Sequence, residues 1–226
     1  MSNDRTQAEQ SALTEMAGLA IRLSRLGYVC IPLRAGGKHL DLAAMGVQPV
    51  HLQSRSKRLK ELAFTSVLFQ LALNPPGEST IAAWFSGRQM NIGLACGVNG
   101  LVAIDFDRPD LYAAWRRRHA AIVGATPVCK SPAGYHVLVR HGLPLVSSSL
   151  HFGFRRAGHI KALGGYVACA PTSLAHGGAY RWLPGQSPID VEPQRVESLA
   201  DMGLYPVSPL KRAYDGMLGR GSFRDH

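Results

Sequence analysis

The strongest constraint on the fold is the segment Leu-Val-Ala-Ile-Asp-Phe-Asp at residues 101–107. Its short aliphatic run, followed by a turn-like Arg-Pro-Asp, is typical of a strand buried inside a sheet. Side chains two positions apart in a strand point to the same face, so Asp105 and Asp107 should project together, about 6.5 Å apart along the strand. Phe106 should point into the opposite layer. The fold must therefore hold two carboxylates at the end of a buried strand.

Two neighbouring carboxylates repel each other, and burying either of them without a partner is unfavourable. A divalent cation removes this cost, because Mg²⁺ prefers oxygen ligands and combines one or two carboxylates with substrate phosphates. Such an arrangement is typical of phosphoryl-transfer sites. The structural alternative is that Asp107 caps a helix beginning at Pro109 while Asp105 pairs with an arginine. The spacing by itself leaves both interpretations open.

Hydrophobic periodicity along the rest of the chain predicts an α+β fold. Helices are expected over residues 6–26, 55–73, from Pro109 to about 123, and near 192–202. Asn99-Gly100 lies between two apolar runs and predicts a hairpin that pairs them. Further strands are expected at 28–33 and in the apolar segments after residue 126. Because helices come first and hairpins follow, we expect an antiparallel or mixed sheet rather than a doubly wound parallel one.

The charge of the chain favours polyanionic partners. Its 25 Lys plus Arg against 15 Asp plus Glu give a net charge of +10, which attracts nucleic acid or nucleotides. The basic residues form separate clusters, and the residues we expect to contact a template backbone are Arg55, Lys57, Arg58, Arg116 and Arg117. Such contacts would be salt-sensitive and independent of base sequence. The alternative is that these clusters are solvated surfaces.

The cysteines and the N-terminal segment indicate a compartment. Cys30, Cys96, Cys129 and Cys169 are far apart and lie in apolar segments, which predicts buried free thiols and no zinc site. The first residues lack the apolar run of a signal peptide, and no apolar stretch is long enough to span a bilayer. We therefore expect a cytoplasmic protein without a membrane partner.

Four motifs, in order along the chain, resemble the prim-pol domain of the archaeo-eukaryotic primase superfamily, also called the bifunctional DNA primase/polymerase N-terminal domain. The resemblance covers about residues 18–185 and rests on the order and spacing of the motifs. The motifs are PLRAGGK at 32–38, TIAAWF leading to NIGLACGVNGLVAIDFD at 80–107, SPAGYH at 131–136, and IKALGGYVACAPTSLAHGGAYRWL at 160–183.

The resemblance implies a fold and an activity. The fold would be an RNA-recognition-motif-like mixed or antiparallel catalytic sheet joined to a smaller α/β part. The activity would be template-directed nucleotidyl transfer, from nucleoside triphosphates, on a single-stranded DNA template. A replicative helicase would come from another chain. We expect the catalytic domain to span residues 1–190, including the N-terminal helix, and a C-terminal helix and basic tail to span 191–226.

The resemblance also assigns residues. Asp105 and Asp107 would bind Mg²⁺ or Mn²⁺, and His136 would contact the phosphates of the incoming nucleotide. Lys161 would hold the triphosphate with His136. Ser131 would contact a phosphate or close a turn. Lys38 follows two glycines without the spacing of a phosphate-binding P-loop, so we expect a surface-loop lysine.

One position departs from the family pattern, because His159 stands where the family has a third metal-binding acid. Histidine binds Mn²⁺ or Zn²⁺ but is a poor Mg²⁺ ligand, and it adds no negative charge. Either two acids suffice, or His159 serves in a site that prefers Mn²⁺. Alternatively, catalysis is lost and the domain binds nucleotide or single-stranded nucleic acid in a replication or mobile-element assembly. A metal-dependent nuclease or phosphohydrolase would use the same carboxylates.

Overall fold

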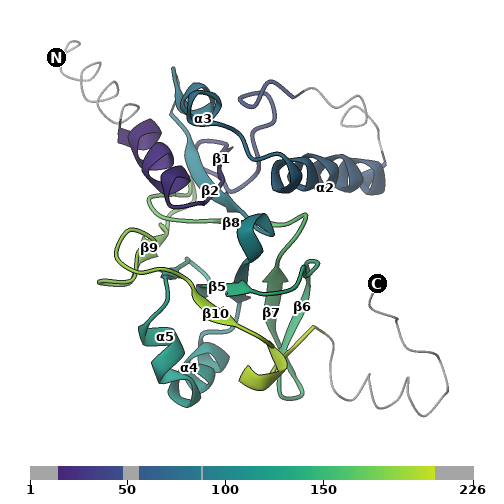
Figure 1. The fold of residues 1–226 in the computed structure, drawn as a ribbon, viewed down its shortest axis with the longest axis vertical. Helices are drawn as coiled ribbons and strands as arrows, with labels where there is room; N and C mark the ends of the chain where they lie inside the picture. The colour runs from purple at the N-terminus through teal and green to yellow at the C-terminus, as the bar shows by residue number, and fades with distance from the viewer. Residues whose placement is uncertain (1–14, 48–55, 88, 207–226) are drawn as a thin grey trace.

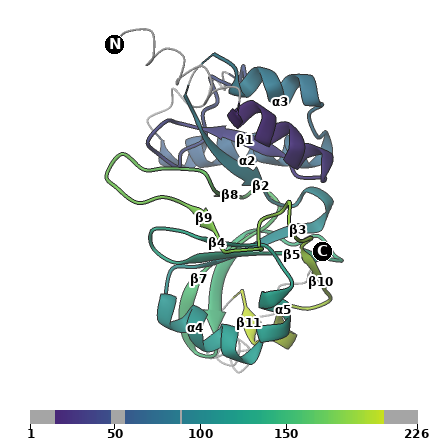
Figure 2. The ribbon, with the colours of Figure 1, turned by 90° about the vertical axis from the view of Figure 1, so that its left-hand side faces the viewer.

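The computed structural model describes residues 15–47, 56–87 and 89–206, and its fold is α+β, as the sequence predicts. Figures 1 and 2 show two parts stacked along the long axis. A small sheet with its helices forms one part, and a large sheet forms the other. Helices α4 and α5 cover the face of the large sheet that points away from the small part (Figure 2).

The smaller part is an antiparallel sheet packed against helices. Its strands, in spatial order, are β1 (Cys30–Leu33), β2 (Asn91–Ala95) and β8 (Tyr166–Ala168). The helices are the N-terminal helix, described over residues 15–25, α2 (Lys57–Leu73) and α3 (Glu78–Phe85). The side chain of Ser56 accepts a hydrogen bond from the amide of Leu59 and so caps α2, as is usual for serine at a helix start.

The larger part is an eight-stranded sheet. Its main path runs β11 (Leu204–Tyr205), β6 (Ser148–Phe152), β7 (Arg155–Lys161), β3 (Leu101–Phe106), β5 (Tyr135–His141), β4 (Val128–Lys130) and β9 (Arg181–Trp182). These neighbours are antiparallel, and β10 (Gln194–Val196) adds a parallel pairing to β5. The sheet is therefore mixed and mainly antiparallel, with β3 at its centre.

Strand β3 contributes to the core on both of its faces. Leu101 and Ala103 belong to the apolar cluster between the two sheets. Val102, Ile104 and Phe106 belong to the cluster beneath α4 (Pro109–Arg118) and α5 (Ala120–Gly124). Alternation continues at Asp105, which therefore points toward the small part, opposite to Phe106; these opposite orientations are what the sequence predicts.

The predicted hairpin around Asn99-Gly100 is wrong. β2 and β3 lie in different sheets, because β1 and β8 already pair with both edges of β2. The connection holds Gly97 and Asn99 at φ +87° and +50°. These left-handed residues turn the chain from one sheet into the other (Figure 1). The turn signal was real, but the partner strands were misassigned.

The predicted helix near 192–202 is also wrong. Residues Gln194–Val196 form β10, which pairs with β5 at Val139–His141. The short strand β4 pairs only with the opposite end of β5, at Tyr135–Val137, so part of that edge remains available to β10. A single 3₁₀ turn, η3 (Ala200–Met202), follows. The helix predicted from Pro109 to about 123 is broken at His119 into α4 and α5.

The four cysteines are free and buried, as predicted. Burial raises the pKa of Cys96 and of Cys129 to about 12, so both stay protonated thiols. No helix among the described residues combines the length and the apolar character needed to cross a bilayer.

Candidate functional site

A cavity of about 450 Å³ lies between the small part and the large sheet. Asp105 on β3, His136 on β5 and Lys161 on β7 line its sheet side. These strands are neighbours, and Asp105 lies directly opposite His136 on one side and opposite His159 on the other. Strand pairing therefore brings Asp105, His136 and His159 side by side, although they are distant along the chain.

His136 is held between the two parts of the molecule. Its Nδ1 lies 3.0 Å from the carbonyl oxygen of Ala168 on β8, and its Nε2 lies 3.2 Å from Oδ1 of Asp105. A carbonyl oxygen only accepts hydrogen bonds, so Nδ1 carries a proton and donates it. The imidazole can also donate to Asp105 when Nε2 is protonated. Asp105 thus pairs with a histidine, not with the arginine that the structural alternative required.

The Asp105 carboxylate is mostly buried, with 15% of its side chain exposed. Burial by itself would raise the pKa of Asp105. The hydrogen bond from His136 and the charges of His136, Lys161 and His159 together outweigh burial and lower this pKa below its ordinary value. Asp105 is therefore ionised at neutral pH.

Asp107 stands just beyond the end of β3 and is half exposed. Its amide donates to the carbonyl of Ala157, and its Oδ2 lies 3.8 Å from Nε2 of His159. Helix α4 begins at Pro109, its N-cap residue is Arg108, and no side chain caps it, so the alternative role of Asp107 as a helix cap is not observed. Its carboxylate remains open to solvent beside the Asp105 strand end.

His159 already has a hydrogen-bond partner at the nitrogen nearest Asp107. The Nη2 of Arg156 lies 3.2 Å from that Nε2; since arginine only donates, Nε2 accepts and is unprotonated. Burial, followed by the charge of Lys161, lowers the pKa of His159, while Asp107 and Asp105 oppose the shift. Neutral His159 therefore offers its lone pair to Arg156.

The family of the chain follows from a comparison with known families. The model of the family described as bifunctional DNA primase/polymerase, N-terminal, matches residues 20–195. The chain belongs to the Prim-Pol family. A comparison with curated proteins gave no match. Prim-Pol membership indicates a primase/polymerase-type nucleotidyltransferase in general, with nucleotides and DNA as its classes of substrate.

The metal-ligating capacity of this Prim-Pol domain depends on its two carboxylates. Within residues 15–47, 56–87 and 89–206, no three His, Cys, Asp or Glu side chains are gathered closely enough to hold a metal ion by themselves. Two carboxylates still match the way Mg²⁺ and Mn²⁺ bind beside substrate phosphates, which supply the remaining oxygens. His159 fits this set only if Arg156 releases its Nε2.

Close backbone packing holds Asp105 in place. Gly158 on β7 has a φ of +152°, and a Cβ at this position would overlap the carbonyl oxygen of Asp105. Gly134, in the SPAGYH motif, approaches the carbonyl oxygen of Phe106 in the same way. Glycine at these two positions allows β7 and the β4–β5 turn to close on the end of β3.

Three other predicted site residues, Ser131, Arg116 and Arg117, do not line this cavity. The hydroxyl of Ser131 accepts a hydrogen bond from the amide of Gly134, 2.9 Å away, which is the turn contact. Arg116 and Arg117 are exposed on α4, behind the large sheet. Arg55 lies outside the described residues, as do the side chains of Lys57 and Arg58 in the first turn of α2.

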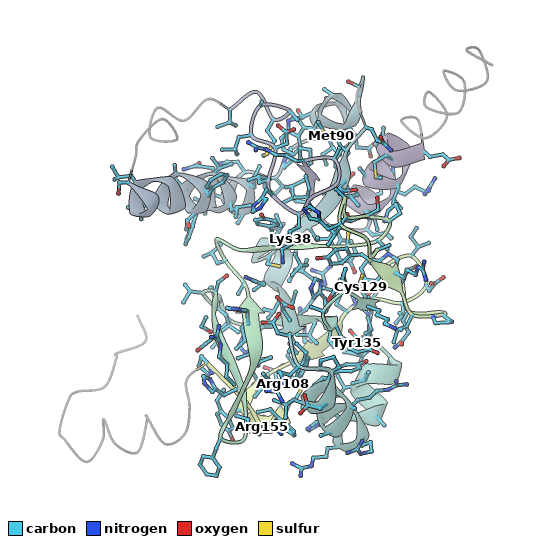
Figure 3. All side chains as sticks on the ribbon, turned by 180° about the vertical axis from the view of Figure 1, so that it is seen from behind. Lys38, Met90, Arg108, Cys129, Tyr135 and Arg155 are labelled. Atoms are coloured by element: carbon cyan, nitrogen blue, oxygen red, sulfur yellow. The ribbon has the colours of Figure 1, made fainter. Side chains whose placement is uncertain are left out.

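Lys38 is a cavity residue that the sequence did not identify. It is exposed, as expected for a loop lysine, yet it lines the same cavity as Asp105. The hydroxyl of Tyr166 donates to its carbonyl oxygen at 3.0 Å and fixes the loop. Figure 3 shows Lys38 near the boundary between the two parts. In the sequence, only the two glycines before Lys38 indicate that it could approach a phosphate. Its position at the cavity depends on how the small part packs against the large sheet.

Proposed function

We propose that this Prim-Pol domain is a DNA primase/polymerase that transfers nucleotides to a strand growing on a single-stranded DNA template. The observation that carries the proposal is the convergence of Asp105, His136 and Lys161 in one cavity of about 450 Å³. That volume lies in the range of small-ligand pockets. One lysine, one histidine that can donate hydrogen bonds and one carboxylate in a pocket suit a triphosphate accompanied by a divalent ion.

The proposed roles follow from the chemistry of each side chain. Asp105 and Asp107 would hold Mg²⁺ or Mn²⁺, which supplies neutralisation of phosphate charge during in-line transfer. His136 and Lys161 would hold phosphate oxygens from the sheet side, and Lys38 would do so from the opposite wall. The rigid placement of His136 by Ala168 favours catalysis by positioning, since little reorganisation is then needed.

A second candidate function is a catalytically silent relative that binds nucleotide or single-stranded nucleic acid in a replication or mobile-element assembly. The observation that favours it is the Arg156–His159 hydrogen bond, which occupies the residue standing at the third metal position. A helicase from another chain would supply the template under either function.

Primer extension separates the two candidates. The assay would use a single-stranded template, a labelled primer and deoxynucleoside triphosphates, in Mg²⁺ and separately in Mn²⁺. The control is the Asp105→Ala Asp107→Ala double variant. Extension that the control lacks would support the polymerase. Nucleotide binding without extension in either metal would exclude the polymerase and support the silent domain.

Replacing His159 with Asp should raise extension in Mg²⁺ by about tenfold relative to extension in Mn²⁺, because an oxygen ligand with negative charge suits Mg²⁺ better than imidazole does. The ratio of the two initial rates measures the effect. Arg156→Gln is the matched control, since it frees Nε2 of His159 without adding an acid and should favour Mn²⁺ instead. An unchanged Mg²⁺-to-Mn²⁺ ratio in both variants would show that His159 does not contact the ion.

Replacing Lys161 with Gln should raise the KM for the incoming nucleotide by roughly 10- to 100-fold, the range expected when one hydrogen bond to a charged group is lost. Lys38→Gln should act in the same direction. Steady-state primer extension at varied nucleotide concentration provides the measurement. Arg25→Gln serves as the control, because Arg25 is exposed and paired with Glu78 away from the cavity. An equal KM in Lys161→Gln and Arg25→Gln would contradict the assignment.

A further inference from the structure

A second cavity, of about 400 Å³, lies on the opposite face of the large sheet beside α4. Its lining includes Tyr112, Arg116 and Arg117 from α4 and Tyr135 from β5. Tyr135 immediately precedes His136, so their side chains point to opposite faces of one strand end. The cavity that His136 lines and this second cavity therefore lie at the same end of β5, on opposite faces of the sheet.

Tyr135 offers a supported aromatic surface. It is partly exposed, and its ring stacks on that of Tyr112 with centroids 3.9 Å apart and planes 15° apart. Tyr112 is itself buried against the rings of Phe106 and Trp115. Figure 3 shows Tyr135 next to the helices that cover this face. A ring held in this way suits stacking against an unpaired base, which needs an aromatic face but no particular base identity.

Positive charge flanks Tyr135 on both sides. Arg116 and Arg117 are exposed on α4, while Lys130 on β4 lies directly opposite Tyr135. Arg181 on β9 lies directly opposite Lys130, and side chains that are directly opposite share a face of the sheet. Two adjacent cations repel each other, and a bound polyanion relieves that repulsion.

These cations are available to a ligand. Over the described part of the chain, none of the four forms an ion pair with a carboxylate. Asp110, the acid in the first turn of α4, is already held by Arg108 and Arg155. The face is thus basic and carries no acid committed to neutralising it.

Tyr112 adds an unused polar group. Its buried hydroxyl has no hydrogen-bond partner among the described residues. Burial raises the pKa of Tyr112 to about 12, so the group remains a donor. A buried donor without a partner is unfavourable in the free protein, and it marks a place where the packing behind Tyr135 is incomplete.

We propose that this face, formed by Tyr112, Arg116, Arg117, Lys130, Tyr135 and Arg181, binds a single strand of nucleic acid, with one base stacked at Tyr135 and phosphates along the cations. The cations lie on three separate elements, α4, β4 and β9, an arrangement that suits the successive phosphates of a strand better than a free nucleotide. Duplex DNA keeps its bases stacked inside and does not offer one to Tyr135. The inference rests on the proposed function only in making this strand the template, because binding itself needs no metal and no transfer.

The first test measures binding separately from catalysis. A fluorescein-labelled oligodeoxythymidylate would be titrated with the full chain carrying Asp105→Ala and Asp107→Ala, without divalent metal, and followed by fluorescence anisotropy. Adding Arg116→Gln and Arg117→Gln should weaken binding about tenfold and lower the salt slope by about 1.4, since each lost phosphate contact on a single strand contributes about 0.7. Lys130→Gln with Arg181→Gln should act alike.

The matched control adds Arg25→Gln and Arg118→Gln, which remove the same charge away from Tyr135. Arg25 pairs with Glu78, and Arg118 lies over the ring of Phe152, 5.3 Å from its centroid. This control should retain most of the affinity. An equal loss in the control would overturn the proposal and leave only non-specific attraction by net charge.

Aromatic variants test the stacking contact. Tyr135→Leu should weaken binding by roughly 5- to 100-fold. Tyr112→Phe keeps the supporting ring and should leave the thermal midpoint equal or higher, because the lost hydroxyl has no hydrogen-bond partner among the described residues. A 5-bromouracil oligonucleotide should cross-link to the peptide that contains Tyr135.

Wild-type affinity in folded Tyr135→Leu, or a cross-link found only elsewhere, would sink the proposal. The same experiments keep it distinct from the proposed function. Primer extension can fail while these variants still lower binding, and extension can persist while they leave binding unchanged.

Discussion

Replacing Asp105 with Asn should lower primer extension by about 10²- to 10³-fold, a loss comparable to the removal of a key electrostatic contact in other active sites. Asparagine keeps the shape of the side chain and an oxygen that can accept from His136. It removes the negative charge that would hold a divalent ion. Initial rates of extension at saturating nucleotide, in Mg²⁺ and in Mn²⁺, provide the measurement.

Asp110→Asn is the matched control for that change. Asp110 is an exposed acid only five residues further along, held by Arg108 and Arg155 outside the cavity. Its loss should leave extension within about twofold of wild type, as for an exposed ion pair of small energetic value. Comparable rates for the two variants, with both proteins folded, would remove Asp105 from the proposed catalytic group.

Replacing Gly158 with Ala should destabilise the protein by about 3 kcal/mol or more. The new Cβ would overlap the carbonyl oxygen of Asp105, and this backbone atom cannot move unless β3 and β7 separate. A loss of that size lowers the thermal midpoint by about 6–12 °C for a chain of this length. Thermal unfolding followed by circular dichroism would measure it, and extension should fall with the displacement of Asp105.

Gly153→Ala isolates the cause. Gly153 lies in the turn between β6 and β7 with a φ of +58°, but a Cβ there meets no atom within 4 Å. Its replacement should cost only the backbone strain of about 1–2 kcal/mol. Similar midpoints for the two variants would mean that conformational strain, not close packing against Asp105, explains the glycine at 158.

Local patterns predicted the centre of the site because strand alternation is a local property. The opposite orientations of Asp105 and Phe106 follow from the side-chain period of a strand, and the structure has both. His136 and Lys161 were assigned by resemblance, and the structure places them in the cavity with Asp105. Their proposed functions still await the experiments above.

The wrong predictions, the hairpin at Asn99-Gly100 and the helix near 192–202, both depend on which strands pair in the assembled sheets. Asn99-Gly100 marks a turn, but nothing local shows that β2 is already paired on both edges. Residues 194–196 become a strand because β4 is too short to cover β5, which is a property of the assembled sheet. The position of Lys38 at the cavity likewise depends on how the small part packs, and the Arg156–His159 contact depends on a register shift between β6 and β7.

The hydrogen bond from His136 to Ala168 couples the packing of the small part to the side chain that contacts Asp105. This hydrogen bond joins the two sheets, and the other nitrogen of the same ring lies 3.2 Å from Oδ1 of Asp105. Separating β8 from β5 would break this hydrogen bond and leave the ring free to rotate away from Asp105. The orientation of the ring that contacts Asp105 therefore depends on how closely the small part packs against the large sheet.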